Sequence, residues 1–169
     1  FTPAANCLLC VAVNYNHGIT SISGHDDGAS WVQVIDDTSG THSFELWACF
    51  TGSSPSSDTI DITISYEWDA AYCVFEIDET VNGVDVSGTV ANAFGTHDYD
   101  SAYVTSGANT RTLTLSSFDD SDNLTLCFAG GQVFPDADPT DFTEVNDAES
   151  ANSRVLSVLY DDQEVTSVE

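Results

Sequence analysis

Short apolar segments rich in valine, isoleucine, threonine and aromatic residues recur along the whole chain, and clusters of turn-forming residues separate them. Such segments, repeated every roughly 8–12 residues, are typical of β-sandwiches and barrels. The predicted strands are Leu8–Asn14, Trp31–Ile35, Phe44–Phe50, Thr59–Ser65, Ala71–Ile77, Val84–Val90, Thr112–Leu115, Leu124–Phe128 and Val155–Tyr160. We therefore expect an all-β fold, an antiparallel β-sandwich of jelly-roll or immunoglobulin-like type with about 9–11 strands.

Alternation of side chains is clearest between Ile60 and Ile64, where Asp61 and Thr63 separate three isoleucines. Successive residues of a strand point to opposite faces, so the isoleucines should face a core and the polar pair the solvent. Between predicted strands, Asn82-Gly83 suits a two-residue hairpin turn.

Two segments lack the strand pattern. Asp147–Asn152 is the best candidate for a helix, although it is short enough to be only a turn, and Gly130–Asp141 with its prolines should be a long surface loop. No internal repeat or low-complexity linker divides the sequence, so we expect one domain over residues 1–169. Because the chain starts at Phe1 without a leader, we expect it to be processed or to be a segment of a longer protein.

Charge changes this picture most. Aspartate and glutamate total 28, against two basic residues, Arg111 and Arg154, which gives a formal net charge of −26. An acidic surface keeps a protein hydrated at high salt, where the Debye length falls to about 3 Å at 1 M. An acidic disordered tail does not fit, because 41% of the residues are hydrophobic and the acids are interspersed. We interpret the charge as adaptation to a high-salt environment, with a calcium-binding charge pattern as the alternative.

The same charge limits the partners. No basic patch is present that could neutralise phosphates, so we expect no nucleic-acid binding. Docking on an anionic membrane has equally little support, and the longest apolar run near the start, Cys7–Val13, is too short to span a bilayer.

The cysteines are five in number, which excludes complete pairing within one chain. Four of them lie in apolar, strand-like segments, which favours small buried side chains over the alternative of a disulfide. A zinc site does not fit, because Cys7 and Cys10 would point to opposite faces of a strand and no second pair completes four ligands. The cysteines are Cys7, Cys10, Cys49, Cys73 and Cys127.

Two loop segments carry enough oxygen ligands for Ca²⁺ or another salt cation, which prefers carboxylates and carbonyls. Neither matches an EF-hand loop, and turn formation by the same residues is the alternative explanation. No other cofactor is expected. The candidate ligands are Asp119, Asp120, Asp122, Asp136, Asp138 and Asp141.

Tyr66 and Trp68 stand beside acids at a predicted strand end, where exposed aromatic rings could stack on a glycan, whereas Trp31 and Trp47 lie within strand patterns and should be core. Asn123-Leu-Thr125 is an N-glycosylation sequon, a short motif with many false positives.

Catalytic signals are weak. The four histidines lie in turn regions, where they are usually solvated, and no serine stands in a Gly-x-Ser-x-Gly turn. Glu76 and Asp78 share one strand face and come nearest to a glycosidase pair, but carboxylate pairs arise by chance among 28 acids. We therefore expect a protein that is not an enzyme and has no catalytic residue.

The order of these segments resembles a β-sandwich domain of tailed-virus structural and appendage proteins. The likeness rests on the opening Phe1–Asn14 strand, on Ser21–Trp31, on Phe44–Phe50, on Asp58–Ile64 and on Val81–Asp85, and it covers about residues 1–165. The resemblance implies a jelly-roll or immunoglobulin-like module in a capsid decoration, turret or tail fibre of a halophilic archaeal virus. That family usually continues into a further strand, whereas this chain stops part-way into it.

The expected function is therefore structural: a subunit of a halophilic virion that assembles with copies of itself and with neighbouring virion or surface proteins, at the virion surface or outside the cell. The alternatives are a carbohydrate-binding or host-adhesion module that binds host glycans, and an archaeal surface filament that uses donor-strand exchange. An unfinished last strand would supply an assembly edge. Its residues are Val165, Thr166, Ser167 and Val168.

Overall fold

The computed structural model of the protein describes residues 1–15, 19–25, 30–39, 42–64, 70–78, 89–94, 113–114, 124–131, 142–150, 154–161 and 167–168. These residues form eleven strands and one short helix, and every strand pair among them is antiparallel. The predicted all-β, antiparallel fold is thereby confirmed. The elements are β1 (Cys7–Tyr15), β2 (Ile19–Ser23), β3 (Val32–Ser39), β4 (His42–Phe50), β5 (Asp61–Ile64), β6 (Ala70–Asp78), α2 (Val90–Ala93), β7 (Leu113–Thr114), β8 (Thr125–Gly131), β9 (Thr143–Glu149), β10 (Val155–Asp161) and β11 (Ser167–Val168).

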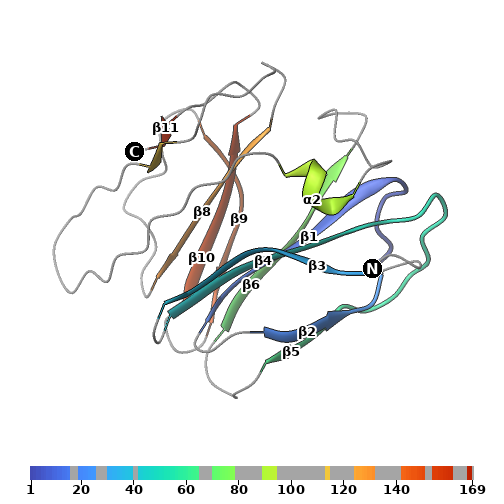
Figure 1. The fold of residues 1–169 in the computed structure, drawn as a ribbon, viewed down its shortest axis with the longest axis horizontal. Helices are drawn as coiled ribbons and strands as arrows, with labels where there is room; N and C mark the ends of the chain where they lie inside the picture. Colours follow the sequence, from blue (N-terminus) through green and yellow to red (C-terminus); the bar gives the residue numbers. More distant parts are fainter. Residues whose placement is uncertain are drawn as a thin grey trace, which may run out of the picture.

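A four-stranded sheet with the order β3-β4-β1-β6 forms the centre of the fold (Figure 1). Its middle strand β1 pairs with β4 and with β6 in unbroken register. All nine residues of β1 are buried, because a further sheet covers each face of this strand. A strand buried on both faces should be apolar at nearly every position, as β1 is.

The inner face of the central sheet packs against a three-stranded sheet with the order β8-β10-β9. Leu8, Cys10 and Ala12 of β1 lie in one apolar cluster with Leu156 and Val158 of β10. Two sheets that bury their apolar faces against each other in this way form the sandwich.

Asn14 is the one polar residue that β1 presents to this inner face. Its side-chain amide donates to the carbonyl of Val155 at 2.7 Å and points at the carbonyl of Gly131 at 3.4 Å. The adjoining Gly130 is required for this approach, because a Cβ there would lie 2.8 Å from Nδ2 of Asn14. The hydrogen bonds satisfy a buried amide and fix the second sheet relative to the first.

The outer face of the central sheet is covered by the two-stranded sheet β2-β5. Val11, Val13 and Tyr15 of β1 form a second apolar cluster with Ile22, and Ile62 packs against them. Ile60, Ile62 and Ile64 are half-buried while Asp61 and Thr63 are exposed, which confirms the alternation predicted there. In Figure 1, β2 and β5 lie on the side of the central sheet away from β8, β9 and β10.

Two edge strands of the larger sheets contain bulges. The β3–β4 register shifts between Gln33 and Ile35, which leaves Val34 as an extra residue in β3. The β9–β10 register shifts between Val158 and Leu159, which leaves Val145 as an extra residue in β9. Bulges of this kind twist a strand and hinder pairing with another chain.

Two strands were not predicted. β2 was missed because its alternating polar residues resemble a turn region, and β9 because five of its seven residues are polar or acidic and nearly all are exposed. The helix or turn predicted over Asp147–Asn152 is wrong in its first half, since Asp147–Glu149 belongs to β9. Pairing with the apolar strand β10 fixes β9 despite its low strand propensity.

Two other boundaries are corrected. Of the strand predicted over Val84–Val90, only Thr89 and Val90 lie in the described part of the chain, where they are the N-cap and the first residue of the single turn α2. The loop predicted from Gly130 begins later, because Gly130 and Gly131 still pair with Leu156 and Val155.

Candidate functional site

A buried carboxylate, Glu45, lies in the middle of β4 and is only 1% exposed. It projects from the outer face of the central sheet, next to the residues that β2 and β5 cover. An unpaired buried charge is costly, so its hydrogen bonds decide whether this position stabilises the fold.

Four donors surround the Glu45 carboxylate. Oε1 accepts from the backbone N–H of Ile19 at 2.7 Å and from the hydroxyl of Tyr15 at 3.4 Å. Oε2 accepts from the indole Nε1 of Trp47 at 2.7 Å and from the amide Nε2 of Gln33 at 2.9 Å. A carboxylate has roughly four acceptor positions, so the donors use its full capacity.

The Glu45 cluster therefore joins four strands. Its donors come from β1, β2 and β3 and from β4 itself, and Ile19 is the first residue of β2. Burial raises the pKa of Tyr15, and the neighbouring Glu45 charge raises it further. Because no acceptor position is left for a substrate, the geometry supports a structural anchor rather than a catalytic base.

A second polar cluster surrounds His25, which is 4% exposed and follows Gly24 after β2. The prediction that the histidines are solvated is wrong for His25, because the ring of Phe1 packs against it at a tilt of 44° and a centroid separation of 4.6 Å. Gly24 has φ of +91°, and a Cβ at this position would meet the carbonyl oxygen of Thr59 at 1.9 Å. Only glycine allows the chain to pass Thr59 this closely.

Asp58 binds the same turn from the other side. Its Oδ1 accepts from the backbone N–H of Thr59 at 2.8 Å. This bond, a second from the backbone N–H of His25 and the attraction of the His25 side chain lower the pKa of Asp58. Asp58 is exposed, so this cluster stabilises a turn at the protein surface and does not form a pocket.

The cysteines contribute to the core. Cys10, Cys49 and Cys73 are buried, as predicted. Cys127, for which burial was also predicted, is only half-buried, and Cys7 is buried as well. Burial raises the pKa of the Cys10 thiol well above its ordinary value, and it also raises the pKa of Cys73. A thiol held in its neutral form is a poor nucleophile and a poor metal ligand.

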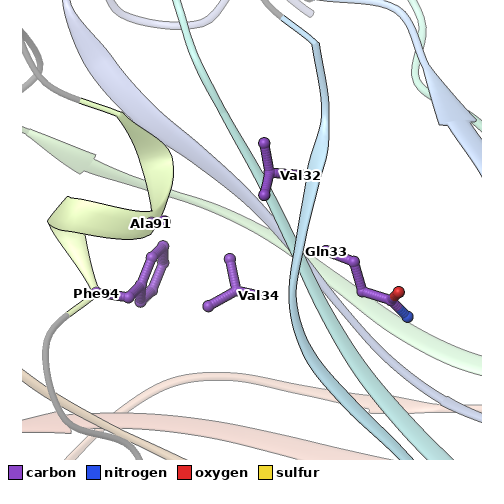
Figure 2. A pocket seen from close by; sticks show the side chains of 5 residues that line it. All are labelled: Val32, Gln33, Val34, Ala91 and Phe94. Atoms are coloured by element: carbon purple, nitrogen blue, oxygen red, sulfur yellow. The ribbon is translucent and has the colours of Figure 1, made fainter.

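A shallow apolar groove of about 120 Å³ separates β3 from α2. Figure 2 shows Val34 and Phe94 projecting toward each other across it, with Val32 at its rim. Gln33 also lines it, but its side chain points away from Val34 and Phe94 (Figure 2) and donates to Glu45. A groove of this size accommodates one apolar side chain rather than a substrate with several polar groups.

The most exposed apolar surface on the central sheet is the outer face of β6. The side chain of Tyr72 is 58% exposed and that of Val74 is 37% exposed. They pair with Val13 and Val11 of β1, which β2 and β5 cover. On β6 the outer apolar cluster includes Ala70 but neither Tyr72 nor Val74. Glu76 continues the same face and accepts a hydrogen bond from the backbone N–H of Ala4 at 3.2 Å.

The predicted ligand residues lie outside the described residues. This holds for all six aspartates proposed for a cation, which are Asp119, Asp120, Asp122, Asp136, Asp138 and Asp141, and for the proposed glycan platform of Tyr66 and Trp68. Within the described ranges, no group of three or more His, Cys, Asp or Glu side chains could hold a metal ion. Both ligand sites stay predictions.

The proposed assembly edge is described only at Ser167 and Val168, which form β11. They pair with Thr114 and Leu113 of β7, so one edge of β11 is used within the chain. Val165 and Thr166 lie outside the described residues.

Glu45 and Tyr72 were both missed by sequence reasoning. An acid within the apolar segment Phe44–Phe50 was a usable signal for Glu45, since a strand buried on both faces cannot hold a charge without partners. No comparable signal existed for Tyr72, because its exposure depends on how far β2 and β5 extend over the sheet.

Comparison with protein-family models, with curated proteins and with solved structures finds no match. The resemblance to virion β-sandwich domains stays a prediction from sequence. No helix in the described part of the chain is long and apolar enough to cross a membrane.

Proposed function

We propose that this chain is a non-enzymatic structural protein of a halophilic virion, in a capsid decoration, a turret or a tail fibre. It would assemble with other copies of itself and with neighbouring virion or surface proteins. The observation that carries the proposal is the net charge of −26 on a chain that nevertheless builds an apolar sandwich core.

The distribution of charge supports this function. The edge strand β9 exposes Glu144, Asp147 and Glu149, whereas the adjoining β10 is almost wholly buried and mainly apolar. Arg154, one of two basic residues in the sequence, is only 6% exposed and therefore offers little positive charge at the surface. Such a surface repels another copy unless salt screens it, and screening at molar salt reduces the range of that repulsion to about 3 Å.

The proposal predicts assembly that depends on salt. We expect a discrete symmetric oligomer in about 3 M KCl, and its dissociation after dilution to about 0.1 M, where the screening length grows to about 10 Å. Light scattering gives the mass and negative-stain images give the symmetry. Adding a chelator during dilution separates general screening from a bound divalent cation.

An assembly that stays intact at low salt with chelator would contradict the role of screening. A monomer under both conditions would contradict the structural function and would favour the carbohydrate-binding alternative, for which a glycan screen is the next measurement. A matched control is dilution into low KCl with added sucrose, which stabilises folding without screening charge.

A further inference from the structure

The edge strands of the two larger sheets differ in how they are protected. β3 has the Val34 bulge and carries Asp36 and Asp37, and β9 has the Val145 bulge and exposes three acids. Bulges and charges at an edge prevent a second chain from adding to it. β8 is regular, but none of its large apolar side chains is exposed.

β6 has neither form of protection along its first half. Its nine residues pair with β1 without a register shift, and from Ala70 to Phe75 it contains no charged side chain. Tyr72 and Val74 are the exposed members of this stretch, at 58% and 37%. A regular, uncharged edge with exposed apolar side chains is where natural sheets accept another strand.

We propose that β6 is the contact between two copies of this chain, which pair antiparallel along it around a two-fold axis at Val74. This inference rests on the proposed structural function and names the surface through which that function is exercised. It leaves the C-terminal segment free of any required role in the contact.

The charge pattern of β6 is compatible with a second copy as the partner. The acids of β6, Glu76 and Asp78, lie in its last three residues. In an antiparallel pair centred on Val74, Glu76 stands opposite Tyr72 of the other copy and Asp78 stands opposite Ala70. No acidic residue of one strand is therefore paired with an acidic residue of the other, although each chain carries a net charge of −26.

The same register keeps the two cores continuous. Ala71, Cys73, Phe75 and Ile77 face the inner apolar cluster of each copy. Pairing around Val74 sets Cys73 opposite Phe75 and Ala71 opposite Ile77, so the inner faces of both sheets stay apolar across the contact. The outer faces bring the two Val74 side chains together between the rings of Tyr72.

Val74→Glu tests the contact, because it would place two carboxylates opposite each other at the axis. We expect its dimerisation constant in about 3 M KCl to weaken by at least about tenfold, since directly opposed like charges destabilise a strand pair. Val32→Glu is the matched control: Val32 is equally exposed, at 37%, and lies on the opposite edge strand of the same sheet. It should leave the constant unchanged, as measured by sedimentation equilibrium.

Val74→Cys tests the register without adding charge. In the proposed pair the two introduced thiols face each other, and mild oxidation with glutathione disulfide should give a covalent dimer on a non-reducing gel. Val32→Cys should give none. Near-ultraviolet circular dichroism of each variant establishes that it is folded.

The outcomes separate this inference from the proposed function. If the unaltered chain assembles but Val74→Glu assembles equally well, or Val74→Cys does not crosslink, the β6 contact is wrong and the structural function stands. If the unaltered chain is monomeric in high salt at every concentration, both are overturned.

Discussion

The two faces of the central sheet are buried by different means. The inner face meets β8, β9 and β10 through apolar side chains, with Asn14 as its one polar bridge from β1. The outer face meets β2 and β5 through a smaller apolar cluster, and the Glu45 carboxylate adds hydrogen bonds from four strands. Apolar contact sets how strongly a layer adheres, whereas directional hydrogen bonds set where it sits.

The largest effect is expected on the inner face. Leu156→Ala removes a fully buried side chain of β10 from the inter-sheet cluster. Truncation of a buried leucine costs about 2–5 kcal/mol, from lost transfer free energy and the cavity that remains. Denaturant unfolding in high salt measures the free energy of unfolding. A loss below about 1 kcal/mol would mean that the two sheets do not pack through β10.

A smaller but more local effect is expected on the outer face. Glu45→Gln replaces one acceptor oxygen by an NH₂ group, which then faces donors instead of accepting from them. We expect a loss of about 1–3 kcal/mol, because at least one buried donor is left unsatisfied. Faster amide hydrogen exchange should appear in β2, which Glu45 holds at Ile19.

Glu149→Gln is the control for the Glu45 variant. It makes the same chemical change at an exposed position of β9 and should alter stability by less than about 0.5 kcal/mol. Equal losses in the two variants would show that charge, and not the buried hydrogen bonds, determines the effect.

The smallest loss of stability is expected for a substitution of Tyr15, and its dependence on pH identifies the contribution of the phenol. Tyr15→Phe removes one long hydrogen bond to Glu45 and should cost about 0.5–1.5 kcal/mol near neutral pH. Because the pKa of Tyr15 is raised in the folded state, the neutral phenol is favoured there. The contribution of Tyr15 to the free energy of unfolding should therefore be fully present below the unfolded tyrosine pKa of about 10 and should fall as the pH rises above it.

The Tyr15→Phe variant has no phenolic proton to release at this position, so its stability curve should be flatter at alkaline pH than that of the parent chain. Unfolding measured between about pH 8 and 11 makes the comparison on either side of the unfolded tyrosine pKa. Parallel curves would show that Tyr15 ionises as readily in the folded state as in the unfolded chain.

The sequence predicts best those strands that are apolar in composition and are also buried in the fold. β1, β4 and β10 are largely apolar and buried, and β6 alternates buried and exposed residues; each was predicted within a few residues of its ends. β9 could not be predicted, because its residues are polar and its partner β10 supplies the reason for its extended conformation. The candidate site was harder still to predict from the sequence, since the donors to Glu45 come from four strands whose arrangement no local pattern encodes.

Burial of Arg154 has a consequence for the solution around the protein. With that guanidinium withdrawn from the surface, at most one arginine side chain, Arg111, is left to offset the carboxylates that face the solvent. Electroneutrality then requires dissolved cations to gather around the folded chain, and their number must change when the chain unfolds or assembles. The dissolved monovalent cations are therefore a thermodynamic component of the native state, and the stability of the chain need not be the same in K⁺ as in Na⁺.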